Sequence, residues 1–116
     1  MTPEIPVVVY RSAWSRARGL IGRPAPAPGS GVLIDPCRQV HTFFMSYPID
    51  TVHLDKSGCV ISILTLSPWR LGPWKLRSKA VLEMAEGEAT RVGLAPGVRP
   101  NLIGTDTRAS TRNSRV

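Results

Sequence analysis

Three side chains that could act together chemically lie within the fourteen residues CRQVHTFFMSYPID, which run from Cys37 to Asp50. Cys37, His41 and Asp50 supply the thiol, imidazole and carboxylate that cysteine-dependent enzymes use as nucleophile, base and orienting group. On a continuous strand Cys37 and His41 would face the same side but lie roughly 13 Å apart, at about 3.3 Å per residue. The pair could act together only if the chain folds back, which Pro36 makes possible. The alternative is a buried cysteine, which is usually inert, beside a hydrogen-bonded histidine.

A zinc site is the second chemistry that these residue types could support, because the chain has two cysteines and two histidines. Residues 51–66 are expected to form a hairpin around Asp55–Gly58, a type I turn whose glycine is left-handed. In that register Leu54 lies opposite Cys59, and His53 points to the other face of the hairpin. Four ligands would not converge, so we predict no metal site and no cofactor.

Two acidic residues stand in apolar surroundings. Glu83 lies inside the apolar strand 80–84, where a buried carboxylate would need a partner such as Arg16. On a half-exposed strand it would instead be an ordinary solvated residue. Asp50 follows Pro48 at the start of a hairpin strand, where an acid either caps backbone N–H groups or lines a pocket. Both alternatives remain open for each acid.

The loop SPWRLGPWKLR, residues 67–77, repeats Pro-Trp with basic residues between the repeats. The cations of this basic loop are Arg70, Lys75, Arg77 and Lys79, and residues 61–79 contain no acid. Aromatic and basic side chains together can stack on bases or contact anionic lipid, so nucleic acid and anionic surfaces are possible partners. The alternative is that the Pro-Trp units cover the edge of a core while the cations are solvated. The net charge of +7 is spread over several segments, which is weak evidence for a nucleic-acid site.

The elements that must position these groups are mostly strands. Apolar and β-branched runs predict strands over 5–10, 32–34, 40–45, 51–55, 59–66, 80–84 and 98–103. A helix is predicted over 12–22, from the cap Ser12 to Gly22, and one or two helical turns over 87–93. The expected fold is a compact β-rich α+β domain in which the helix over 12–22 covers one face of the sheet.

The length of 116 residues fits one globular domain with its own core, which we place over residues 1–103. Residues 104–116 have no apolar period and are predicted to be a disordered basic tail. No stretch approaches the roughly 18 apolar residues of a membrane span. The N-terminus lacks the basic region of a secretory signal. The chain as given is therefore expected to be soluble and cytoplasmic, or exported if a signal preceded it.

Three stretches carry an ordered set of motifs: SRARGLIGR over 15–23, SGVLIDPCRQVHTFFMSYPIDTVHLDKSGCVISI over 30–63 and AVLEMAEGEATRVGLAPG over 80–97. The set resembles the family called domain of unknown function 192, whose pattern falls on Arg16, Gly19, Leu20, Gly31, Leu33, Phe44, Met45, Pro48, Asp50, Asp55, Gly58, Leu82, Glu83 and Gly87. The chain departs from the pattern at Ile21, at Phe44, where Trp is common, and at Gly97-Val98, where Gly-Asp is frequent. The resemblance implies a small, mostly β domain with a partly closed, barrel-like sheet and one or two short helices. It implies no reaction, because the family has no established activity.

The sequence supports three functional hypotheses. The first is a non-catalytic binding or accessory module for a small molecule or a protein, with ligand-binding candidates Arg16, His41, Phe44, Met45, Asp50 and Glu83. The second is an enzyme with Cys37 as nucleophile, His41 as base and Asp50 as orienting group. The third is a surface that contacts nucleic acid or anionic lipid through the basic loop. The identity of the ligand does not follow from the residues in any of the three.

Overall fold

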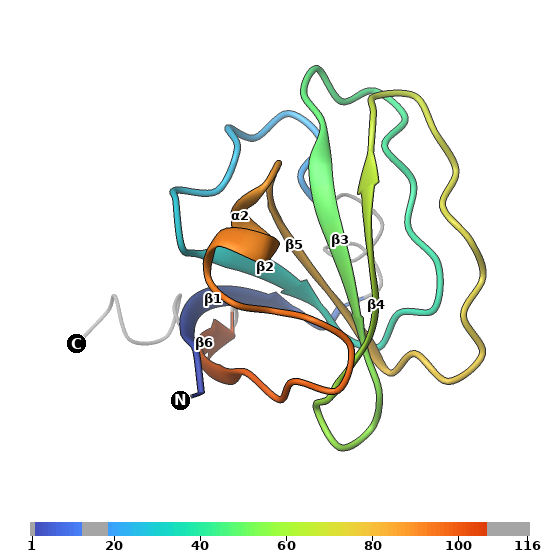
Figure 1. The fold of residues 1–116 in the computed structure, drawn as a ribbon. Helices are drawn as coiled ribbons and strands as arrows, with labels where there is room; N and C mark the ends of the chain where they lie inside the picture. Colours follow the sequence, from blue (N-terminus) through green and yellow to red (C-terminus); the bar gives the residue numbers. More distant parts are fainter. Residues whose placement is uncertain (1, 13–18, 107–116) are drawn as a thin grey trace.

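The computed structural model describes residues 2–12 and 19–106, and this part of the chain consists mostly of strands and loops (Figure 1). Its elements are β1 (Glu4–Tyr10), β2 (Gly31–Ile34), β3 (Ile49–Leu54), β4 (Val60–Leu66), β5 (Ala80–Ala85), α2 (Glu88–Arg91) and β6 (Asn101–Asp106). The described strands form one six-stranded sheet in the order β4-β3-β5-β2-β1-β6. The predicted α+β fold, mostly β with a short helix, is thereby confirmed.

The sheet is mixed and stays open. β1 lies parallel to both β2 and β6, whereas the pairs β2–β5, β5–β3 and β3–β4 are antiparallel. The sheet twists strongly, so that β1 and β2 run across the direction of β3 and β4 in Figure 1. The edge strands β4 and β6 do not pair with each other in the described sheet, so the sheet is not closed into a barrel.

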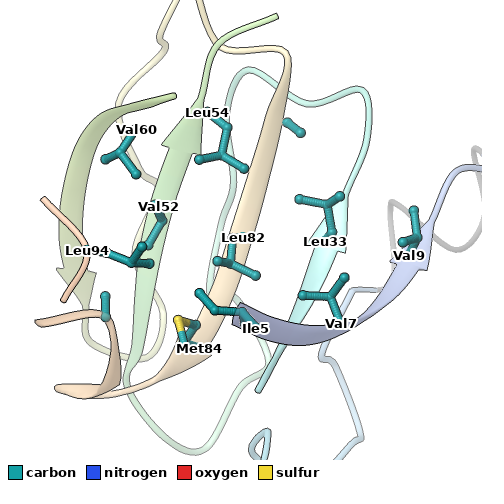
Figure 2. Packing of buried hydrophobic residues seen from close by; sticks show 12 residues of the cluster. Ile5, Val7, Val9, Leu33, Val52, Leu54, Val60, Leu82, Met84 and Leu94 are labelled. Carbon is teal, nitrogen blue, oxygen red and sulfur yellow. The ribbon is translucent and has the colours of Figure 1, made fainter. Parts of the chain in front are cut away.

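The central strands β3 and β5 are buried along nearly their whole length, which gives the sheet two apolar faces. Because side chains alternate along a strand, Leu82 and Met84 of β5 point to the first face, and Val81 and Glu83 point to the second. Figure 2 shows the cluster on the first face. Its members are Ile5, Val7, Val9, Leu33, Val52, Leu54, Val60, Ala80, Leu82, Met84, Ala89 and Leu94. Ala89 belongs to α2, so this face is the one that the short helix covers.

Loops cover the second face. Its buried apolar residues are Tyr10, Leu20, Val32, Ile34, Met45 and Ile49 in one cluster, and Val40, Leu66 and Val81 in another. Residues 38–45 and 67–76 run beside each other on the β4 side of the molecule, and we name them the covering ribbon (Figure 1). Backbone hydrogen bonds join them from Thr42 N–H to Arg70 O (2.8 Å) and from Gly72 N–H to Val40 O (2.9 Å).

Some predicted elements differ from the structure. Residues 40–45 are not a strand: His41 makes an isolated bridge with Leu71, and Phe44 has a left-handed backbone (φ 66°) that ends any extended run. The last strand begins at Asn101 and not at residue 98, and it continues through residue 106 beside β1. The predicted turns over 87–93 are confirmed as α2.

Part of the sequence prediction falls on residues that the structure does not describe. The middle of the helix predicted over 12–22 lies at 13–18, outside the described residues, and the described residues 19–22 form turns. Residues 107–116 of the predicted tail are outside them too. Within the described ranges, no helix is long and apolar enough to cross a membrane.

The hairpin of β3 and β4 has the predicted turn but not the predicted register. Gly58 is left-handed (φ 89°), and its N–H donates to Asp55 O at 3.0 Å. Asp55 itself pairs with Cys59, through Asp55 N–H to Cys59 O at 2.9 Å, so Leu54 lies opposite Val60. A bulge then shifts the register between His53 and Leu54. The prediction that Leu54 faces Cys59 is therefore wrong, because the turn leaves three residues, 56–58, between its paired ends, one fewer than the four that we assigned to it.

Candidate functional site

A pocket of about 470 Å³ lies on the second face of the sheet, at the covering ribbon. Three parts of the chain wall it: residues 19–21, residues 36–41, and single side chains from the sheet and the ribbon. The single side chains are Ile34, Met45, Trp74 and Glu83. Cys37 and His41 both line this one pocket. Six of the thirteen lining residues belong to the stretch from Cys37 to Asp50 that the sequence singled out.

Glu83 is the buried acid of the pocket. It sits in the middle of β5, between β2 and β3, and is 2% exposed. Among the described residues, Glu83 Oε1 has no hydrogen-bond partner. The hydroxyl of Thr51, the residue paired with Glu83 on β3, donates instead to Leu64 O at 2.7 Å. Burial raises the pKa of Glu83 from 4.5 to about 8, so at neutral pH the carboxyl mostly keeps its proton.

His41 is half-buried at the pocket wall. Its Nδ1 accepts a hydrogen bond from Phe43 N–H at 3.1 Å, and its ring stacks on the Phe43 ring with centroids 5.0 Å apart. An Nδ1 that accepts leaves the proton of the neutral ring on Nε2. The ring nitrogen left for a ligand is therefore the donor Nε2–H.

Cys37 lines the same pocket, but its thiol is engaged with the backbone. Cys37 Sγ donates to Gln39 O at 3.2 Å. The carbonyl of Cys37 accepts from the Ser78 hydroxyl at 2.8 Å. With His41 Nδ1 occupied by an amide, the described hydrogen bonds do not join thiol and imidazole into a dyad. Neither Cys37 nor Cys59 forms a disulfide.

Asp50 lies on the opposite face of the sheet from the pocket. It is 2% exposed, and its Oδ2 accepts the N–H of Ala89 in the first turn of α2 at 3.0 Å. Its Oδ1 accepts the Thr65 hydroxyl at 2.8 Å. The N-cap residue of α2 is Gly87, which has no side chain to do this, so Asp50 supplies the cap from β3. Both carboxylate oxygens are used, and neither orients His41.

The remaining binding candidates are divided between the pocket and the surface. Met45 is buried in the pocket wall, whereas its neighbour Phe44 points outward and is 69% exposed. Arg16 lies outside the described residues. The structure thus brings His41, Met45 and Glu83 together and leaves Phe44 and Asp50 elsewhere.

The four cations of the basic loop do not behave alike. Lys79 forms an ion pair with Asp35. Within the described part of the chain, Arg70, Lys75 and Arg77 form no ion pair, although the charge of Arg77 helps to lower the pKa of Asp55. The unpaired positive charge therefore lies along residues 70–77.

His53 is a buried residue to which the sequence assigned no role. It is 1% exposed, its Nδ1 is 2.9 Å from the Ser78 hydroxyl, and its Nε2 has no described partner. Burial first, and the charge of Lys75 second, lower its pKa. Because side chains alternate along a strand, the sequence could have placed His53 on the same face as Thr51, two residues before it. Nothing in the sequence predicted its contact with Ser78. No group of three His, Cys, Asp or Glu residues in the described ranges could hold a metal ion.

The comparisons with known proteins point to one family. The model of DUF192, described as Uncharacterized ACR, COG1430, matches residues 2–101. A UPF0127 protein of Pyrococcus horikoshii, PH1112, is 38% identical over 49 residues, which are 42% of this chain and 43% of that protein. Another of Pyrococcus abyssi, PYRAB11210, is 41% identical over 44 residues, 38% of each chain. The matched segments span less than half the length of these relatives.

Two solved structures share the fold. A protein of unknown function from Novosphingobium aromaticivorans has a TM-score of 0.70 at 23% identity, covering 78% of this chain and 70% of that one. A protein from Sinorhizobium meliloti, described as a candidate transcription regulator, has a TM-score of 0.68 at 24% identity, covering 79% and 78%. At this identity the likeness concerns the fold alone.

Proposed function

Since the chain belongs to the DUF192 family, whose description assigns no activity, we propose its function from the geometry of the pocket: it is a non-catalytic module that binds a small molecule, with Glu83 as the polar anchor. The observation that carries this proposal is a buried carboxyl without a described partner at the wall of a cavity of about 470 Å³. A volume of roughly 300–1,000 Å³ with a few placed polar groups is typical of small-molecule sites.

The unsatisfied state of Glu83 supports a role in binding and not in stability. A buried polar group without a partner destabilises a fold by about 1–3 kcal/mol, and a ligand that supplies the partner recovers that energy. Because Glu83 mostly keeps its proton at neutral pH, it presents an O–H donor to the pocket. The Nε2–H of His41 is a second donor. Two donors in a wall that also contains apolar side chains such as Leu20, Ile34 and Met45 favour a partly apolar ligand with an acceptor, such as an amide or a ketone.

The enzyme hypothesis has less support. A cysteine nucleophile requires a thiol activated by a base, and the base requires an orienting group. Cys37 donates to Gln39 O, and Asp50 caps α2 on the other face. The reaction would have to begin by breaking both arrangements.

The test is a fragment screen by NMR with ¹³C-labelled methionine methyl groups. The probes are small amides and ketones, with primary alkylamines as a separate set. Met45 lines the pocket and Met84 lies in the core of the first face, so one spectrum contains both the reporter and its control. We expect amides or ketones to shift the Met45 methyl while the Met84 methyl stays in place.

Variants then assign the shift to Glu83. Glu83→Leu should abolish the shift of Met45, and Glu83→Gln, which keeps a donor, should retain part of it. Glu86→Gln is the matched control, because Glu86 is an exposed residue in the turn after β5. Binding that survives Glu83→Leu, or a response to amines alone, would contradict the proposed anchor and its donor chemistry.

A further inference from the structure

Large exposed apolar side chains gather along the outer side of the covering ribbon. Of the eight such side chains in the described ranges, five are Phe44, Trp69, Leu71, Trp74 and Leu76. We name these five the outer patch. Leu76 is the most exposed of them, at 73%. Exposed apolar groups that cluster in this way, unlike those scattered singly, mark an interaction surface.

The backbone holds this patch outward. Phe44 and Trp69 both have left-handed backbones, with φ of 66° and 64°, which aromatic residues rarely adopt. Their rings are in contact at a centroid distance of 4.7 Å. Trp69 N–H donates to Thr42 O at 2.9 Å, so the two segments that carry the rings are tied together. The fold therefore accepts backbone strain at two positions where the result is an exposed aromatic pair.

The two segments that carry the patch also carry positive charge. Arg38, Arg70, Lys75 and Arg77 lie on the two segments of the ribbon or directly beside them. Among the described residues none of them forms an ion pair, although the charge of Arg77 helps to lower the pKa of Asp55. Residues 36–49 and 56–82 contain no Asp or Glu. The covering ribbon thus combines exposed apolar side chains with cations, which complements a surface with anionic groups above an apolar layer.

We infer that the covering ribbon docks on an anionic lipid membrane, with the outer patch among the head groups and the four cations on lipid phosphates. Tryptophan and phenylalanine suit the interfacial region, and basic residues add attraction to anionic lipid. A single-stranded nucleic acid would use the aromatic rings and the cations but not Leu71 or Leu76, which have no π face for a base to stack on. The two leucines therefore favour the lipid surface.

The test uses the whole chain and two sets of vesicles, one of phosphatidylcholine and one of phosphatidylcholine with an equal part of phosphatidylglycerol. We expect co-sedimentation with the anionic vesicles, weaker as salt is raised, and little with the neutral ones. Leu71→Ser combined with Leu76→Ser should weaken the partition coefficient by about tenfold or more, since both side chains leave water on docking. Arg70→Gln combined with Arg77→Gln should weaken it by about tenfold on anionic vesicles only.

Ile103→Ser is the matched control, because Ile103 is also exposed but lies on β6 at the far edge of the sheet. It should bind like the wild type. Circular dichroism verifies that each variant is folded. Equal loss in Ile103→Ser overturns the inference. So does binding to a poly-dT strand without binding to vesicles, or a dimer in light scattering that the leucine variant dissociates.

Discussion

A carboxyl group in the centre of a buried strand must find a partner or keep its proton, and Glu83 does the second. Its position between β2 and β3 removes it from water on both sides, while the pocket leaves it reachable by a ligand. Cys37 and His41 share that pocket, but each makes a hydrogen bond to the backbone. At the scale of residues, the site therefore offers hydrogen-bond donors and a carboxyl group removed from water, and not a nucleophile.

The protonation of Glu83 predicts a pH dependence of stability. Its pKa is about 8 in the fold and ordinarily 4.5, so its contribution is fully present below pH 4.5 and is lost as the pH rises through about 8. The loss is at most about 5 kcal/mol, at 1.36 kcal/mol per pH unit. Glu83→Gln does not titrate and should lose much less stability over this interval. Urea unfolding of both proteins at several pH values measures the difference, and identical slopes would contradict the burial of the carboxyl.

The hydrogen bond from Cys37 to Gln39 O predicts an ordinary thiol. Iodoacetamide at neutral pH should alkylate Cys37 no faster than a free model thiol, because the thiol donates its proton to the backbone carbonyl of Gln39, and a carbonyl does not deprotonate a thiol. Peptide mass spectrometry follows Cys37 and Cys59 in the same sample, so Cys59 serves as the internal reference. A Cys37 that reacts much faster than the model thiol would restore the enzyme hypothesis.

At the scale of elements, side chains on the strands supply hydrogen-bond partners for backbone groups of a helix and a loop. α2 has four residues and a glycine at its N-cap, so its first turn depends on Asp50 of β3. Ser78, beside the covering ribbon, connects His53 of β3 to the carbonyl of Cys37. These two links attach the covers of the first and second faces to the sheet between them.

Asp50→Ala should destabilise the fold by about 2–4 kcal/mol, because it removes the cap of α2 and the partner of Thr65 from a buried position. Asp50→Asn keeps an oxygen acceptor and should lose less. Thr65→Val, which removes only the second bond, is the matched control for denaturant unfolding. An Asp50→Ala variant as stable as Thr65→Val would show that the cap contributes little.

His53 predicts a pH dependence of opposite sign. Its pKa lies below its ordinary 6.5, because burial and Lys75 disfavour the charged ring. Its contribution to stability is therefore present above pH 6.5 and is lost as the pH falls below that value. His53→Gln, which cannot titrate, should flatten the acid side of the stability curve in thermal unfolding. A curve that is unchanged on that side would place the charged ring in contact with water.

At the scale of the whole molecule, the sheet separates structure from function. The first face is closed by α2 and a large apolar cluster. The second face is covered by loops. The pocket lies between these loops and the sheet, and the outer patch lies on the loops themselves. Trp74 belongs to both, so a ligand in the pocket and a membrane at the ribbon would meet at one side chain.

Local patterns in the sequence determined much of this protein. β1 forms where the β-branched run over 5–10 predicts a strand. The turn Asp55–Gly58 and the helical turns bounded by Gly87 and Gly93 follow from glycines that adopt positive φ. The sequence also predicted that Glu83 lies inside an apolar strand, because the residues next to it in the chain are apolar.

Tertiary structure alone decided what those groups do. The register of β3 and β4 depends on a bulge that no residue type in the hairpin predicts. Asp50 became a helix cap because α2, more than thirty residues later, packs on β3. Glu83 became a pocket group because β5 inserts between β2 and β3 and because residues 36–41 fold over it. Each outcome depends on pairing between distant segments, whose free energy comes from burial in the assembled fold and is not written in any short stretch of chain.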